Sequence, residues 1–288
     1  MHYIDHNATS PLRPECLLAM TSALAIGGNP SSVHGAGRAA RAVMEEARDK
    51  VAALVNAPAA SVIFTSGATE SCSLALFGAA EGSLDSEDAK NGSRITRVFV
   101  SAVEHKAVLK SAERLAERMP WIHLTILPVT ADGVLDLEAL RVELREGKGR
   151  ALVAVMAANN EIGVIQPIAE ISRLAREAGA LLLVDAVPAA GKIDLDFSLC
   201  DYMVLSAHKM GGPLGSGALV VADGAPLAPQ LVGGGHQRGL RAGSENLSGI
   251  AGFGAAAQSL RDAQGERERI KHLRDHFEAA LKLSLIHI

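Results

Sequence analysis

The chain has 288 residues, a formal net charge of -4 and 48% hydrophobic residues, enough to bury the core of one large α/β domain or of one domain and part of another. Charges of both signs are scattered along it without a basic stripe, so a nucleic-acid partner is not expected. We also expect no signal peptide and no membrane span, because neither pattern is visible. The cysteines, Cys16, Cys72 and Cys200, follow no recognisable spacing, which is typical of a reducing cytoplasm.

The first part of the chain predicts an irregular opening followed by a helix, a strand and another helix. Residues 1–30 are polar and rich in turn residues. Spaced Val and Leu among alanines and charges predict a helix over 34–56. The β-forming run 61–65 predicts a strand, followed by a turn and an apolar helix to about residue 80. Residues 81–94, rich in Gly, Ser, Asp and Glu, predict a surface loop.

The alternation of strand and helix continues toward the C-terminus. Strands are expected at 97–101, 124–127, 151–156, 180–184, 202–205 and 217–221, and helices at 106–118, 137–145 and 168–178. From about residue 247 the pattern is helical and becomes highly charged. Alternation of this kind predicts an α/β fold with a mostly parallel central sheet and helices on both faces.

One lysine follows a predicted buried strand directly. Ser206, His208 and Lys209 come after the apolar run 202–205 and before a glycine-rich turn. In open α/β sheets ligands bind outside the carboxyl ends of the strands. A lysine held there loses hydration, so its pKa falls from about 10.4 and its amine can form a Schiff base. Taken alone, Lys209 could equally be a surface lysine at a strand end.

An aspartate ends the preceding predicted strand. Asp185 follows residues 180–184, and by itself it could be a turn acid or a helix cap. A lysine and an aspartate on neighbouring strand ends are, however, what a pyridoxal phosphate site requires. The lysine holds the aldehyde as an imine, and the aspartate keeps the pyridine nitrogen protonated.

Three other strand ends carry residues of complementary type. The turn Ser66–Glu70 lies between a strand and a helix, where free N–H groups and the helix dipole bind phosphate, although Thr69 could simply cap the helix. His105 could stack on a flat ring or be a structural histidine. Asn160 offers an amide group at the same edge, or belongs to a plain turn.

Together these stretches resemble the cysteine desulfurases, which are class V aminotransferase-like, fold type I pyridoxal phosphate enzymes. The matching stretches, in the same order as in that family, are Tyr3–Thr9, Gly28–His34, Thr65–Glu70, Glu104–Val108, Asn159–Pro167, Asp185–Val187 with Gly191 and Lys192, Ser206–Lys209 and Gly233–Ser244. The resemblance extends to about Ala257.

The resemblance implies roles for particular residues. Lys209 would form the imine with pyridoxal 5'-phosphate, Asp185 would pair with the ring nitrogen, and His105 would stack over the ring. The residues implied to bind the cofactor's phosphate are Ala68, Thr69, Ser206 and His208, with Asn160 near the ring oxygen and the substrate. In the homodimer formed by the family, Ser244 would reach the partner's cofactor phosphate. No metal is implied.

The implied activity converts L-cysteine to L-alanine and passes the sulfur to an enzyme cysteine as a persulfide. A sulfur-acceptor protein, either a scaffold or a carrier, would then receive it for iron–sulfur cluster assembly or thiolation. Another class V enzyme (an aminotransferase, selenocysteine lyase or β-eliminating lyase) and a cofactor-free remnant remain alternatives. A dinucleotide-binding module is a further one, since Gly252–Ala257 fits G-x-G-x-x-A, but no strand precedes this stretch.

The sequence also departs from the family. Pro188 stands where the family usually has a glutamine, and proline offers neither a side-chain donor nor a backbone N–H. The family's nucleophilic cysteine and its substrate-binding arginine have no counterpart, so we expect a C-terminally truncated chain. Its expected parts are a cofactor-binding domain over 1–256, with 1–15 packing on the small domain, and the start of that small domain over 257–288.

The three cysteines do not match the motif of the missing nucleophile. Cys72 lies early in a predicted helix, where a thiol could have a lowered pKa. A small packing residue is the favoured interpretation of Cys72.

Overall fold

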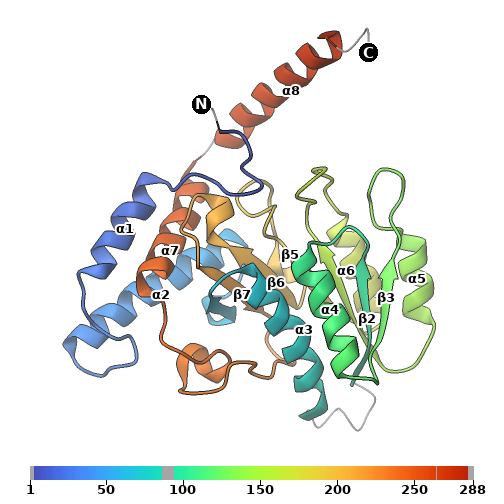
Figure 1. Ribbon diagram of the computed structural model, residues 1–288, viewed down its shortest axis with the longest axis horizontal. Coiled ribbons are helices and arrows are strands. Elements are labelled where there is room, and N and C mark those ends of the chain that lie inside the picture. Colours follow the sequence, from blue (N-terminus) through green and yellow to red (C-terminus); the bar gives the residue numbers. More distant parts are fainter. Residues whose placement is uncertain (1–2, 86–93, 264, 285–288) are drawn as a thin grey trace.

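The computed structural model describes residues 3–85, 94–263 and 265–284, and its strands form one sheet (Figure 1). The strands are β1 (Val62–Thr65), β2 (Ile95–Ser101), β3 (His123–Leu127), β4 (Arg150–Met156), β5 (Leu181–Asp185), β6 (Tyr202–Ser206) and β7 (Gly217–Val221). They lie in the order β1-β7-β6-β5-β4-β2-β3. Every neighbouring pair is parallel except those of β7, which runs antiparallel to β1 and β6. The predicted mostly parallel sheet is confirmed.

Helices cover both faces of this sheet (Figure 1). They are α1 (Pro14–Leu24), α2 (Gly35–Leu54), α3 (Ala68–Asp85), α4 (Lys106–Arg118), α5 (Leu137–Arg145), α6 (Ile168–Glu177), α7 (Leu247–Asp262) and α8 (Glu266–Ser284). Side chains of α3 and α4 belong to one hydrophobic core, and side chains of α2, α5, α6 and α7 belong to the other. Because successive strand residues face opposite sides, Val153 of β4 lies in one core and Leu152 in the other. Each strand therefore contributes to both cores.

The opening segment differs from its prediction, because Pro14–Leu24 form helix α1. Proline is well suited to the first position of a helix, where its missing N–H is not needed. The amphipathic signal is weak, since Cys16 and Ala23 are buried while Leu17 and Leu18 are exposed. Helix α1 packs against α7, and this packing stabilises it. The local sequence pattern does not indicate this contact.

Small residues of α7 allow that close packing. A methyl group added at Gly252 would lie 2.8 Å from the Cγ of Met20 in α1, and one added at Gly254 would lie 2.6 Å from the Cα of Ala47 in α2. The stretch that fits a dinucleotide-binding motif is thus the middle of a packed helix. The expected domain boundary after residue 256 also falls inside this helix, which spans Leu247–Asp262.

Helix α3 is longer than predicted and reaches Asp85, so the loop expected from residue 81 begins later. The remainder of that predicted loop, at 86–93, lies outside the described residues. The backbone N–H of Ala228 donates to the carbonyl of Gly78, and a methyl group at Gly82 would meet the backbone N of Leu227 at 2.7 Å. Gly82, which falls in the predicted loop, therefore allows close packing of α3 against the backbone of Leu227.

The topology brings five strand ends to one edge of the sheet. Since β7 is antiparallel to both neighbours, β1 points the same way as β6, β5, β4 and β2. In the register of the sheet Met156 lies beside Asp185, each the last residue of its strand. None of the helices within 3–85, 94–263 and 265–284 is long and apolar enough to cross a bilayer.

Candidate functional site

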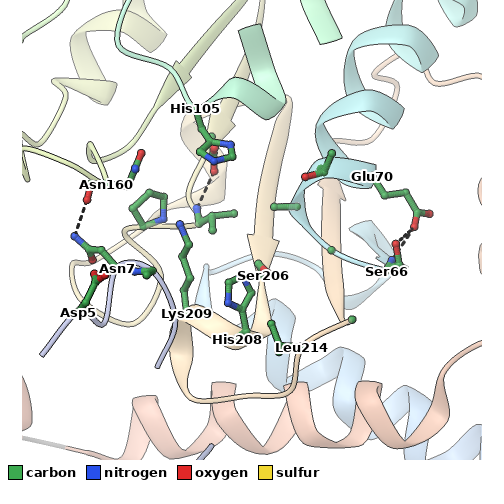
Figure 2. A pocket seen from close by; sticks show the side chains of 18 of the residues that line it. Asp5, Asn7, Ser66, Glu70, His105, Asn160, Ser206, His208, Lys209 and Leu214 are labelled. Atoms are coloured by element: carbon green, nitrogen blue, oxygen red, sulfur yellow. Dashed lines mark hydrogen bonds between the residues drawn. The ribbon is translucent and has the colours of Figure 1, made fainter. Parts of the chain in front are cut away.

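A cavity of about 560 Å³ opens at this edge of the sheet (Figure 2). Its volume is in the range of cofactor and small-molecule sites. The predicted site residues that line it are Ala68, Thr69, His105, Asn160, Asp185, Ser206, His208 and Lys209. Ser244 is exposed and is not among the lining residues. The structure thus brings together residues from five separate strand ends.

Lys209 lies on the 3-10 turn that follows β6, and its side chain extends into the cavity (Figure 2). Partial burial lowers the pKa of its amine, while the carboxylates of Asp185, Glu161 and Asp5 oppose that shift. The turn is held by the N-terminal segment. The Ser10 hydroxyl donates to the Lys209 carbonyl (3.0 Å), and the Ser10 N–H donates to the His208 carbonyl (2.8 Å).

Asp185 is buried at the end of β5 and also lines the cavity. Its Oδ1 accepts a hydrogen bond from the N–H of Val187 at 3.0 Å. Burial raises the pKa of Asp185, and the Val187 N–H, His105 and Lys209 act in the opposite direction. A positive group bound next to Asp185 would therefore stabilise the ionised form of this carboxylate.

The turn between β1 and α3 forms another part of the cavity wall. Ala68 and Thr69 are the first residues of α3, and the N–H groups of a first helical turn have no partner within the helix. The turn rests directly on β7, because a methyl group at Gly217 would lie 2.6 Å from the Cα of Gly67. This helix N-terminus is arranged to accept an anion.

His208 and His105 are each fixed by one ring nitrogen. The Nδ1 of His208 lies 3.2 Å from the Thr9 hydroxyl, and burial, followed by the charge of Lys209, lowers the pKa of His208. His105 caps α4, with its Nδ1 accepting from the N–H of Ala107 at 3.1 Å. That bond leaves the proton of the neutral His105 ring on Nε2.

The N-terminal segment supplies cavity residues to which our sequence reasoning assigned no role. Asp5 and Asn7 line the cavity beside Asn160. The side chain of Asn7 donates to the Asn160 carbonyl at 3.2 Å and accepts from the Lys192 amine at 2.6 Å. Their membership in the motif Tyr3–Thr9 was the available signal.

Glu104 is a second buried acid behind the cavity, again without a predicted role. Its Oε1 accepts from the Met156 N–H at 2.6 Å, which ties the loop before His105 to the end of β4. Its Oε2 is buried without a hydrogen-bond partner among the described residues. Burial, followed by repulsion from Asp185, raises the pKa of Glu104 well above its ordinary value. Burial thus disfavours the charged form of both acids, and more strongly that of Glu104.

We expect Glu104→Gln to change how stability depends on pH. Because the pKa of Glu104 is raised on folding, its contribution is fully present below the unfolded pKa of about 4.3 and is lost as pH rises, by about 1.4 kcal/mol per pH unit until the folded pKa is reached. Glutamine does not titrate. Between pH 5 and pH 7, the free energy of unfolding of Glu104→Gln, measured in urea and taken relative to wild type, should therefore rise by about 1 to 3 kcal/mol. Glu113→Gln, at an exposed site on α4, is the control. Equal pH dependence in wild type and Glu104→Gln would contradict the assignment.

All three cysteines are free and buried. Burial raises the pKa of the Cys16 thiol, and burial together with Asp185 and Glu104 raises that of Cys72. The lowered thiol pKa considered for Cys72 is thus wrong, because desolvation outweighs the helix N-terminus. Burial also raises the pKa of Cys200. Across the described ranges there is no group of three or more His, Cys, Asp or Glu side chains that could hold a metal ion.

Comparison with known proteins relates this arrangement to one family. The sequence matches the class-V aminotransferase family over residues 2–285. It is 41% identical to the IscS-like cysteine desulfurase of Mycobacterium tuberculosis, over 96% of this chain and 69% of that protein. It is 40% identical to cysteine desulfurase IscS 1 of Archaeoglobus fulgidus, over 96% of this chain and 70% of that protein.

Solved structures agree in fold. A NifS-like protein superimposes with a TM-score of 0.88 and 34% identity, covering 97% of this chain and 75% of that one. A structure of SspA in complex with cysteine gives a TM-score of 0.82 and 30% identity, covering 94% and 78% of the two chains.

The cofactor of this family is pyridoxal 5'-phosphate, and the cavity has the chemistry to hold it. The N-terminus of α3 suits the phosphate, buried Asp185 suits a protonated ring nitrogen, and the amine of Lys209 lies in the same cavity. The chain thus belongs to the class-V aminotransferase family, and within it to the cysteine desulfurases.

Proposed function

We propose that this protein removes the sulfur of L-cysteine and transfers it to a thiol, leaving L-alanine. In the balanced step, L-cysteine and a thiol R–SH give L-alanine and the persulfide R–S–SH. The Cβ–S bond breaks, an S–S bond forms to the acceptor sulfur, and Cβ receives a proton. The observation that carries the proposal is that Lys209, Asp185 and the N-terminus of α3 line one cavity.

Pyridoxal phosphate, when bound, supplies an aldehyde that combines with amines and a ring that accepts electrons from the substrate. The N–H groups of Ala68 and Thr69, with Ser206 and His208, would hold the phosphate. Asp185 would hold a proton on the ring nitrogen, because a buried carboxylate gains from an adjacent cation. These assignments rest on the placement of the five residues around the cavity.

Lys209 would act where protons move, and His105 would position the ring. Burial lowers the pKa of the Lys209 amine and so favours its unprotonated, nucleophilic form. Lys209 would hold the aldehyde of the cofactor and would move a proton at the substrate's Cα. His105, fixed as an N-cap, would cover one face of the ring. Asn160 would lie near the ring oxygen. Pro188 also lines the cavity but has no N–H or side-chain donor to offer there.

The thiol that accepts sulfur is proposed not to be one of the three cysteines of this sequence. Each is buried, and each has a raised pKa, whereas a thiolate is the attacking species. The acceptor would then be a thiol other than those of Cys16, Cys72 and Cys200. A sulfur-acceptor protein serving iron–sulfur cluster assembly or thiolation is the proposed final recipient.

We further propose a homodimer that works in the cytoplasm. Ser244 is exposed and does not line its own cavity, which favours a role at the partner's phosphate. Free thiols at every cysteine favour a reducing compartment.

The proposal predicts that protein loaded with pyridoxal phosphate produces alanine from L-cysteine when a small thiol such as dithiothreitol is supplied as acceptor. Alanine and sulfide should form in equal amounts, measured by amino-acid analysis and a sulfide assay, because the reductant releases sulfide from the persulfide. L-Selenocysteine is the parallel substrate. Pyruvate and ammonia in place of alanine would instead identify a β-eliminating lyase, and turnover of L-selenocysteine alone would identify a selenocysteine lyase.

A further inference from the structure

A carboxylate occupies an unexpected place at the anion-binding turn. Glu70 lies in the first turn of α3 and lines the cavity. Its Oε2 accepts from the Ser66 N–H at 2.8 Å and from the Ser66 hydroxyl (Figure 2). Partial burial raises the pKa of Glu70, but hydrogen bonds from Arg241 and Ser66 outweigh it, so the net pKa is lowered. Glu70 is therefore ionised beside the place proposed for a phosphate.

An ionised carboxylate there would repel a phosphate, because like charges near a partly buried site are poorly screened. It also takes up the Ser66 N–H, which could otherwise serve the anion. Something must cancel this charge if the turn is to bind a phosphate.

Arg241 supplies the opposite charge from a distant part of the chain. Its Nε lies 2.7 Å from Oε1 of Glu70, and its Nη2 lies 3.2 Å from Oε2. The two side chains are only 17% and 20% exposed, so the pair is better shielded from water than an ordinary surface ion pair. Two parallel contacts of this kind fix orientation as well as charge.

We propose that Arg241 is a positioning residue that neutralises Glu70 and thereby allows the turn after β1 to accept the phosphate of the cofactor. The inference rests on the proposed function. In it, Arg241 affects the phosphate site only through Glu70. Arg241 lies three residues before Ser244, so the same contact ties this protomer's phosphate turn to the segment proposed to serve the partner's cofactor.

The test is a double-mutant cycle on Glu70→Gln and Arg241→Met, with dissociation constants measured for pyridoxal phosphate and, separately, for inorganic phosphate as the probe. Arg241→Met should weaken binding of both by about 10-fold or more, since it leaves an unpaired anion at the site. Glu70→Gln should bind at least as tightly as wild type. The double variant should return to within about threefold of wild type, because no net charge is then left unpaired. Arg173→Met, which breaks a remote ion pair on α6, is the matched control and should bind both like wild type.

The outcomes separate this inference from the proposed function. A double variant as weak as Arg241→Met, or an Arg241→Met variant that binds like wild type, overturns the inference. Wild type that binds the cofactor but produces no alanine overturns the proposed function only, and wild type that binds neither ligand overturns both. Should Arg241→Met not fold, Arg241→Lys takes its place. Arg241→Lys keeps the charge but loses the two-pronged contact. The inference is supported if Arg241→Lys binds more weakly than wild type and if adding Glu70→Gln restores the affinity. It is contradicted if Arg241→Lys binds like wild type or if Glu70→Gln does not restore the affinity.

Discussion

Lys209→Ala is expected to lose covalent attachment of the cofactor and to reduce alanine formation by about 10³- to 10⁴-fold, since it removes both an amine nucleophile and a proton-transfer group. Borohydride reduction of loaded wild type, followed by peptide mass spectrometry, should place the label on Lys209. The variant should carry none and should release its cofactor on dialysis. Burial lowers the pKa of this amine, so we expect it to react ahead of exposed lysines.

Lys192→Ala is the matched control for that experiment. The Lys192 amine donates a hydrogen bond to Oδ1 of the cavity-lining Asn7 at 2.6 Å, but Lys192 is not itself among the lining residues. The Lys192→Ala variant should keep the label on Lys209. Label found on Lys192 in wild type, or retained in Lys209→Ala, would contradict the assignment of the amine.

Asp185→Asn is expected to weaken binding of the cofactor by about 10- to 100-fold, because a hydrogen bond to a charged group contributes about 1.5–3 kcal/mol. Turnover should fall further, by about 10²-fold or more, since the amide cannot stabilise a protonated ring nitrogen. The dissociation constant and the rate of alanine formation measure the two effects.

If the role of Asp185 were purely structural, replacing it would lower the stability of the cofactor-free protein. The opposite is expected for a residue that serves the cofactor. Burial raises the pKa of this carboxyl, so its ionised form is destabilising in the cofactor-free protein. Cofactor-free Asp185→Asn should therefore unfold at the same or a higher urea concentration than wild type at pH 7. Asp136→Ala is the comparison, because Oδ1 of Asp136 caps α5 by accepting the N–H groups of Glu138 and Ala139 at 2.9 and 3.0 Å, and loss of an N-cap costs about 1 kcal/mol. That variant should lose stability and keep cofactor affinity, and the reverse pattern would refute the role of Asp185.

Much of the fold follows from local signals in the sequence. The helices at Lys106–Arg118 and Leu137–Arg145 and the strand at Gly217–Val221 match their predictions, since apolar periodicity and turn residues act between near neighbours in the chain. Polar residues directly after buried strands also indicated where a site would form. Helix α1 was missed, because its stability comes from packing on α7.

The sequence by itself determined which residue types follow each strand, and hence that an amine, an acid and an anion-binding turn would share one edge of a parallel sheet. Only the tertiary structure decided how these groups are positioned and how their pKa values are shifted. Contacts such as Ser10 with Lys209, Glu104 with Met156, and Glu70 with Arg241 join residues 199, 52 and 171 positions apart. Such partners leave no periodic pattern, because their energy depends on burial and distance in the folded chain rather than on spacing along it.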